Sequence, residues 1–291
     1  MNMNNHRINT GLTDFDNITR GLAGGHLITI AGRPVMGKTA FAITLMVNIG
    51  IEQQIPVAFF SIEMSEVQIC ERILKNCGIY KSDCLSEDSE DFNPSDYQKE
   101  LCTLAESPIY IDDTPSISID EMEDKITSLI SNYGVKVVFI DYLQMINGFE
   151  VNPDSIMKCL KGIAINHGIS IAIISQLYKD FYTLKPYDSD SDEDFFRGAK
   201  KDIMDNSDTV ILLYRHDYYT PIEDSFEHQN KAEAIILKGN NEQIETVPLT
   251  FLPEFAKFTD YIADNNPSIK VVDVIRNRNE LEEWKRKIGL I

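Results

Sequence analysis

The stretch Ala31-Gly32-Arg33-Pro34-Val35-Met36-Gly37-Lys38-Thr39-Ala40 decides the fold class of this chain. It matches the pattern G-x-x-x-x-G-K-[ST] at every fixed position, from Gly32 to Thr39. The apolar run at 26–30 before it indicates a buried strand, and the run at 40–47 after it has a helical pattern. A strand, a glycine turn and a helix are the setting in which this pattern forms a phosphate-binding loop; the alternative is a chance glycine turn before a helix.

The residue types in this loop suit the chemistry of phosphate. Gly32 and Gly37 carry no Cβ, so the backbone can curl around phosphate groups. Backbone N–H groups and the positive end of the next helix would face the phosphate oxygens. Lys38 would reach the β- and γ-phosphates, and the Thr39 hydroxyl would hold Mg²⁺. The expected nucleotide-binding residues are Gly32, Arg33, Pro34, Val35, Met36, Gly37, Lys38, Thr39 and Ala40.

Composition places the chain among ordinary globular proteins. It has 291 residues, of which 43% are hydrophobic and 25% charged. No apolar run approaches the roughly 20 residues that a membrane span needs. The first residues lack the apolar core of a signal peptide. We therefore expect a cytoplasmic location and no membrane partner.

Charge and cysteine content narrow the function further. There are 27 basic and 46 acidic residues, a net charge of −19. Nucleic-acid binders usually display a basic footprint, so this total argues against strong nonspecific DNA binding, although a local basic channel is compatible with it. The 5 cysteines form no CxxC pair and the 5 histidines show no metal spacing. Neither a disulfide framework nor a zinc site is indicated.

Apolar runs alternate with amphipathic segments along the chain, which predicts an α/β fold with a mainly parallel sheet covered by helices on both faces. Thr13 or Asp14 would cap a short helix that runs through Arg20, and Ser65 and Ser118 would cap two further helices. Another helix is expected at about 154–166. The polar stretch 81–97 is expected to be a loop or an insertion, and a second long polar stretch runs from 178 to 206. The expected strands are 26–30, 56–62, 108–111, 135–140, 169–174 and 209–214, with a C-terminal β-hairpin from 232–237 and 244–251.

Three polar residues follow the ends of predicted parallel strands, where such sheets bind ligands. Asp141 follows an apolar run, the pattern of a carboxylate that supports Mg²⁺. Glu63 could orient and deprotonate an attacking water, and Gln176 could sense a γ-phosphate. Taken one at a time, each could equally be a solvated polar residue at a strand end. Together with the phosphate loop they favour a nucleotide-hydrolysing site.

Several co-linear stretches give the chain its resemblance to a known family. They are 10–16, 32–39, Phe60-Ser61-Ile62-Glu63-Met64-Ser65, Pro108-Ile109-Tyr110-Ile111-Asp112-Asp113-Thr114-Pro115, Ile140-Asp141-Tyr142-Leu143-Gln144, Ser175-Gln176-Leu177, Leu213-Tyr214-Arg215 and 251–255. The chain resembles the ATPase domain of the DnaB-type replicative DNA helicases, which have a RecA-like fold. The match covers residues 9 to 258, so we expect an ATPase domain at 1–258 and a C-terminal tail with a terminal helix at 259–291.

The resemblance implies roles for particular residues. Glu63 would be the catalytic base, Asp141 the carboxylate of the Mg²⁺ site, and Gln176 the sensor of the γ-phosphate, with Lys38 also catalytic. ATP would bind at the subunit interfaces of a ring hexamer that encircles single-stranded DNA. The family also has an N-terminal collar domain, whereas few residues here precede the match. Ring assembly, and any loader or primase contact through the collar, is therefore left open.

The chain departs from the family's final motif, which has a lysine and, two residues on, an arginine that reaches the neighbouring subunit's γ-phosphate. Here Lys238 is kept and is expected to bind the nucleotide, but Asn240 stands at the arginine position. An arginine finger can be worth about 10³–10⁵ in rate. Hydrolysis should therefore be slow unless another basic group takes its place.

The loop before residue 209, which is basic in the family, is acidic at 188–194 in this chain. Arg197, Lys200 and Lys201 remain as candidates for nucleic-acid contact. The loop's alternating aspartates hint at a calcium loop, but Glu193 occupies the required glycine position, so we interpret it as a flexible acidic loop. The tail ends in basic residues, which would contact nucleic acid or a partner, or simply face solvent on a helix.

The sequence thus predicts an ATP-dependent DNA helicase domain that works in replication. Its expected partners are single-stranded DNA, further copies of itself and a host helicase or other replication protein. The alternative is an ATP-binding regulatory or assembly protein that has lost unwinding. A strand-exchange ATPase of the recombinase type fits the motif wording less well.

Overall fold

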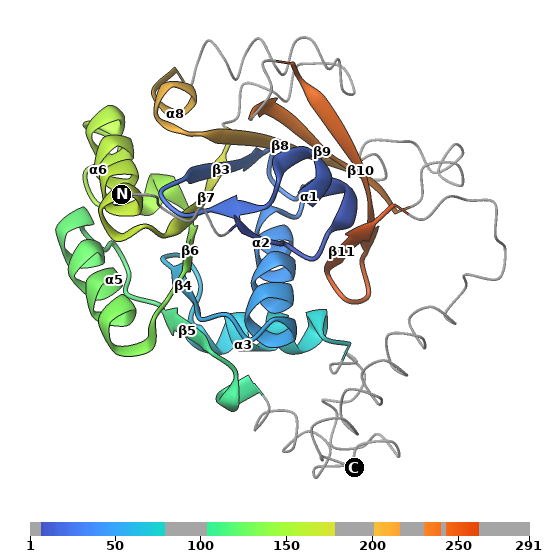
Figure 1. Ribbon diagram of the computed structural model, residues 1–291, viewed down its shortest axis with the longest axis horizontal. Coiled ribbons are helices and arrows are strands. Elements are labelled where there is room, and N and C mark those ends of the chain that lie inside the picture. Colours follow the sequence, from blue (N-terminus) through green and yellow to red (C-terminus); the bar gives the residue numbers. More distant parts are fainter. Residues whose placement is uncertain (1–6, 79–103, 178–200, 216–229, 240–242, 262–291) are drawn as a thin grey trace, which may run out of the picture. The chain divides into compact units, whose positions relative to one another are not determined.

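The computed structural model describes residues 7–78, 104–177, 201–215, 230–239 and 243–261, and the following account concerns those residues. Residues up to Asp260 belong to one compact unit built on a nine-stranded sheet with the order β11-β10-β9-β8-β3-β7-β6-β4-β5 (Figure 1). The parallel strands are β3 (Leu27–Gly32), β4 (Val57–Ser61), β5 (Ile109–Asp112), β6 (Val137–Asp141), β7 (Ser170–Gln176) and β8 (Thr209–Arg215).

The other edge of the sheet is antiparallel. Strands β9 (Lys231–Lys238) and β10 (Glu245–Leu252) form the predicted hairpin, and β9 pairs antiparallel with β8. Strand β11 (Lys257–Asp260) was not predicted; it extends the sheet by pairing antiparallel with β10. Its four residues are too few for an alternating pattern to stand out. A separate two-stranded sheet pairs β1 (Arg7–Ile8) with β2 (Leu22–Ala23).

Helices cover both faces of the sheet, as the alternation of elements predicted (Figure 1). On one face lie α1 (Thr13–Thr19), α2 (Lys38–Val47) with a π-helical extension at Asn48–Glu52, and α3 (Glu66–Asn76). On the other lie α5 (Ile119–Tyr133), α6 (Pro153–His167) and the short α8 (Lys201–Asn206), with a 3₁₀ turn at Leu143–Met145. Within the described ranges no helix is long and apolar enough to cross a membrane.

Helix α2 lies inside the core, which explains why its sequence is apolar on all sides. Phe41 on this helix is fully buried and contacts two rings edge-on. The ring of Phe15 on α1 lies 5.7 Å away and that of Phe258 on β11 lies 5.4 Å away, centroid to centroid. The helix that follows the phosphate loop is thereby fixed against both a helix and the last strand of the sheet.

The helix caps agree with the prediction where the capping residue lies directly before the helix in the sequence. Ser65 forms the capping box of α3 with Gln68, and Ser118 caps α5, both as predicted. The prediction that Thr13 or Asp14 caps α1 is wrong, because the N-cap position is Leu12. The carboxylate of Asp260 accepts hydrogen bonds from the backbone N–H groups of Thr13 and Asp14 instead, at 3.0 and 3.4 Å. A cap supplied from the far end of the domain leaves no local sequence signal.

The polar stretch at 81–97 and the tail beyond 261 lie outside the described residues, as does most of the stretch at 178–206. Strand β11 carries the compact unit through Asp260. The predicted division of the chain after residue 258 stays a prediction.

Candidate nucleotide-binding site

The carboxyl ends of the parallel strands meet at one edge of the sheet, and the predicted site residues gather there. The strand register places Gly32 beside Gln176, and Ser61 beside Asp141. A pocket of about 340 Å³ opens at this edge. Its lining residues are Val35, Gly37, Lys38, Thr39, Ala40, Glu63, Arg72, Asp141, Tyr142, Ile174, Gln176, Phe251 and Ala256.

The backbone of the phosphate loop has left-handed conformations at two positions. Gly37, at the N-cap of α2, has φ 85°, and a Cβ there would lie 3.1 Å from the Phe258 ring. Val35 has φ 69°, which is unfavourable for a β-branched residue. Such strain is typical of functional segments. Because α2 begins directly after this turn, its first N–H groups are available to an anion.

Lys38 is the buried cation of the pocket. The residue is only 7% exposed, and its Nζ donates a hydrogen bond to the backbone carbonyl of Arg33 at 2.7 Å. Burial lowers the pKa of Lys38 to about 8, although the nearby carboxylates of Asp141 and Glu63 oppose the shift. The folded chain therefore holds this charge at a cost, which a bound polyphosphate would offset.

Asp141 and Thr39 form a pair beside Lys38. The Thr39 hydroxyl donates to Oδ2 of Asp141 at 2.7 Å, and Asp141 is 4% exposed. Burial raises the pKa of Asp141 to about 6; the bond from Thr39 and the positive charge of Lys38 lower it, and Glu63 raises it further. A hydroxyl and a carboxylate are the oxygen donors that Mg²⁺ prefers, usually with water and phosphate completing its shell, so these residues fit that ion. No cluster of three or more potential metal ligands occurs among the described residues.

Glu63 and Gln176 lie in the same pocket as the phosphate loop. Glu63 is exposed, two residues beyond the end of β4, and interacts electrostatically with both Lys38 and Asp141. Gln176 is the last residue of β7. Ligands bind at the carboxyl ends of parallel strands, and this rule predicted that both side chains lie next to the loop. The structure has them there.

Two polar residues that support this pocket have no role predicted from the sequence. Arg72 on α3 lines it and interacts electrostatically with Asp141. Gln144 is buried in the turn after β6, and its amide binds two neighbouring residues of β7: Nε2 donates to Ser175 Oγ at 2.9 Å, while Oε1 accepts from the Gln176 backbone N–H at 3.2 Å. A position three residues after Asp141 was the available signal for Gln144; nothing in the sequence singled out Arg72.

Lys238 lies away from the phosphate loop of its own chain. It ends β9, which runs antiparallel to β8, and it pairs with Val210 near the start of that strand. Its Nζ donates to the Met204 carbonyl at 2.6 Å. It lines a second pocket of about 400 Å³ at the amino ends of the parallel strands, with His26, Lys161 and Asp208 among its neighbours.

Of the predicted nucleic-acid contacts, Lys201 is exposed at the start of α8. Arg197 and Lys200 lie outside the described residues, as do the acidic segment at 188–194 and Asn240.

A glycine loop between β3 and α2, with lysine, threonine and strand-end carboxylates in one pocket, is the arrangement of the phosphate-loop class of proteins with a RecA-like fold. A family model described as the DnaB-like helicase C-terminal domain matches residues 7–260. The chain belongs to this family.

Relatives and solved structures agree with the assignment. The chain is 34% identical to the replicative DNA helicase DnaB of Geobacillus stearothermophilus, over 87% of this chain and 56% of that protein. It is 32% identical to the probable replicative DNA helicase of Trieres chinensis, over 88% of this chain and 57% of the relative. It thus spans little more than half the length of these curated relatives.

Two solved structures share the fold. One, described as an ATPase domain, has a TM-score of 0.75 and 26% identity, covering 90% of this chain and 93% of that one. A DnaB-like replicative helicase, described with its interactions with primase, has a TM-score of 0.74 and 26% identity, covering 89% of this chain and 63% of that one. The prediction of a RecA-like helicase ATPase domain is confirmed at the level of family and fold.

Proposed function

We propose that this chain binds ATP with Mg²⁺ and hydrolyses it, as the ATPase part of a replicative DNA helicase acting on single-stranded DNA. One observation carries the proposal: Lys38, Thr39, Asp141, Glu63 and Gln176 line a single pocket at the carboxyl ends of the parallel strands. Five residues expected from separate stretches of sequence converge on one place.

Each side chain has a chemical task in this proposal. The oxygen of a water attacks the γ-phosphorus, the bond to the β–γ bridging oxygen breaks, and ADP leaves. The Glu63 carboxylate takes the proton of the attacking water. Lys38 balances the charge of the β- and γ-phosphates, and Gln176 contacts the γ-phosphate. Mg²⁺, held through Thr39 and Asp141, would supply further neutralisation of phosphate charge.

The two buried charges lead us to expect a pH-dependent affinity for Mg-ATP. The Asp141 carboxyl, with pKa about 6, is ionised only above that pH, and Lys38, with pKa about 8, is charged only below that value. Binding should therefore be tightest between about pH 6 and pH 8 and weaken on both sides. Titration with a fluorescent ATP analogue from about pH 5 to about pH 9 measures this. A flat affinity across that range would contradict the assigned charges.

The position of Lys238 supports assembly with further copies. It lies at the amino ends of the parallel strands, whereas the phosphate loop of its own chain lies at their carboxyl ends. Any contact of Lys238 with nucleotide must therefore involve a neighbouring copy. We propose a homo-oligomer, a hexamer by resemblance, with Lys238 reaching the neighbour's nucleotide. Single-stranded DNA would contact Arg197, Lys200 and Lys201. A host helicase or another replication protein is the further proposed partner.

A second candidate function is an ATP-binding regulatory or assembly protein with weak hydrolysis and no unwinding. Asn240 at the position of the arginine finger and the net charge of −19 favour it.

Steady-state ATP hydrolysis by the purified chain, with and without single-stranded DNA, tests the proposal. Turnover that rises at least about tenfold with DNA is expected for a motor domain. A slow, DNA-independent rate with intact ATP binding would favour the regulatory function. No ATP binding at millimolar Mg-ATP would overturn both.

A further inference from the structure

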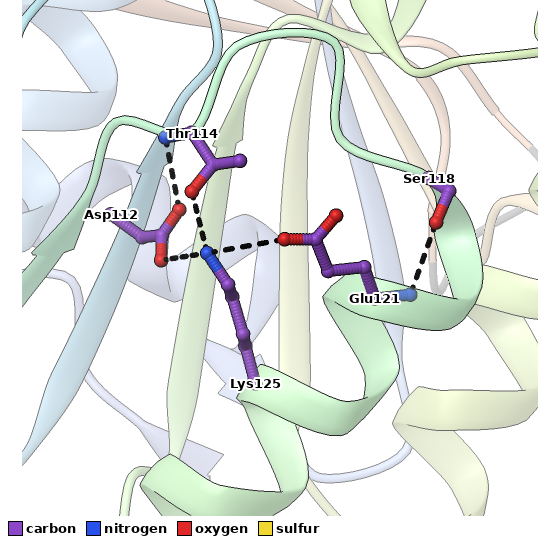
Figure 2. Close-up of polar contacts among 5 residues, drawn as sticks. All are labelled: Asp112, Thr114, Ser118, Glu121 and Lys125. Carbon is purple, nitrogen blue, oxygen red and sulfur yellow. Dashed lines mark hydrogen bonds and ion pairs between the residues drawn. The ribbon is translucent and has the colours of Figure 1, made fainter.

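Figure 2 shows a polar network in the turn between β5 and α5. Its residues do not line the nucleotide pocket and have no role in the proposed reaction. The ammonium of Lys125 on α5 contacts three side chains: Oδ2 of Asp112 at 2.7 Å, the Thr114 hydroxyl at 2.5 Å and Oε1 of Glu121 at 3.6 Å. Oδ1 of Asp112 accepts from the Thr114 backbone N–H at 3.1 Å. The network fixes the residues on both sides of Asp113.

Within this network the Asp112 carboxylate and the Lys125 ammonium each stabilise the charged form of the other. Burial alone would raise the pKa of the Asp112 carboxyl, but the hydrogen bonds from Lys125 and Thr114 outweigh it and hold that pKa below its usual value. Burial likewise opposes the charge of Lys125, and its bond to Asp112 raises its pKa nevertheless. Both groups are therefore ionised at neutral pH.

Asp113 connects this fixed turn to the nucleotide pocket. Its Oδ2 accepts a hydrogen bond from the backbone N–H of Glu66, the first residue of α3, at 2.9 Å. The Ile62 N–H, at the other end of the segment that links β4 to α3, donates to the backbone carbonyl of Asp141 at 2.9 Å. Glu63 lies between these two anchors.

We propose that Asp113 is a positioning residue for Glu63: held in place by the Asp112–Thr114–Lys125 network, it anchors the start of α3 and so fixes the turn that carries the Glu63 carboxylate. The inference rests on the proposed function, because it concerns the rate of the step in which Glu63 takes a proton. Since misplacement of a catalytic group by about 1 Å can cost up to about 10²-fold in rate, loss of one anchor should act on turnover.

The variants Asp113→Ala and Asp113→Asn separate this role from a general effect on folding. Asp113→Ala should lower kcat about five- to tenfold and leave the KM for ATP unchanged. Asp113→Asn keeps an oxygen that can accept the bond from Glu66 and should restore most of the rate. Asp120→Ala, at an exposed aspartate in the first turn of α5, is the matched control and should change neither constant. Equal loss in the Asn and Ala variants, or an unchanged kcat in Asp113→Ala, would overturn the proposal.

Lys125→Met tests the network behind Asp113. It should lower kcat in the same direction, and combining it with Asp113→Ala should give no further loss, because both act through one anchor. Additive losses would show that Lys125 acts by another route and would contradict the proposed coupling.

Hydrogen exchange resolved to single amides gives a readout that needs no catalysis. In Asp113→Ala the Glu66 amide should exchange at least about tenfold faster, while the Ile62 amide keeps its protection. Unchanged exchange at Glu66 would mean that Asp113 does not anchor the turn. If the unchanged chain fails to hydrolyse ATP, the proposed function fails, and this exchange result still decides whether Asp113 anchors α3.

Discussion

Replacing Glu63 by glutamine should lower ATP turnover by about 10²–10⁴-fold, the range that general-base catalysis contributes. Glutamine keeps the size and hydrogen-bonding reach of the side chain but cannot accept the proton of the attacking water. Glu63 is exposed in a pocket that also contains Lys38 and Asp141, so its carboxylate is accessible to a water at the γ-phosphate. Single-turnover hydrolysis, which excludes product release, is the measurement that isolates this step.

The Glu63→Gln variant should still bind Mg-ATP. Removing the Glu63 charge from the pocket removes repulsion toward phosphate, so the dissociation constant for Mg-ATP should stay within about threefold or become lower. Glu71→Gln, an exposed residue of α3 that does not line the pocket, is the matched control and should leave both turnover and binding unchanged. Turnover within about threefold of the unchanged chain in Glu63→Gln would remove Glu63 as the base.

Much of the pocket could be predicted because its signals are local or follow from topology. The glycine pattern and its flanking runs predicted the loop, which the structure places between β3 and α2. The apolar runs predicted the parallel strands, and the rule that ligands bind at their carboxyl ends predicted that Glu63, Asp141 and Gln176 would lie together. That inference did not require the three-dimensional positions of the strands.

The residues that were missed act across distances in sequence. Gln144 joins β7 to the turn after β6, and Asp260 caps α1 from the last strand of the domain. Neither contact has a repeating pattern or a fixed spacing from its partner. Lys238 is a different case: its place in the family's final motif predicted contact with nucleotide, and the antiparallel direction of β9 puts it at the amino ends of the parallel strands, away from the phosphate loop of its own chain. Its contact with nucleotide stays a prediction.

Replacing Lys38 by methionine should have opposite effects on binding and on stability. A charge-assisted hydrogen bond contributes about 1.5–3 kcal/mol, so the dissociation constant for Mg-ATP should rise about 10- to 150-fold, and hydrolysis should fall to background. The same lysine is buried in the folded chain with its pKa lowered from 10.5 to about 8, which corresponds to roughly 3 kcal/mol against the charged form.

The sign of the stability effect follows from that pKa. At pH 7 the ammonium is charged in both the folded and the unfolded chain, so the full cost of burying it is present. The cost fades between about pH 8 and pH 10.5, where the folded chain alone has lost the proton. Methionine removes the charge but leaves the Arg33 carbonyl without its bond from Nζ. A net gain of about 1–2 kcal/mol at pH 7 is expected, which raises Tm by roughly 2–8 °C.

Thermal unfolding of the nucleotide-free chain at pH 7 and at about pH 10, with and without Mg-ATP, measures both effects. Lys38→Met should raise Tm at pH 7, show a smaller gain at about pH 10, and abolish the stabilisation by Mg-ATP. Lys161→Met is the matched control: Lys161 pairs with Asp208 at 2.6 Å at the opposite edge of the sheet, so its loss should lower Tm and leave the Mg-ATP stabilisation intact. A lower Tm in Lys38→Met would mean that the buried ammonium stabilises the empty site and that the loop is not held at a cost for phosphate.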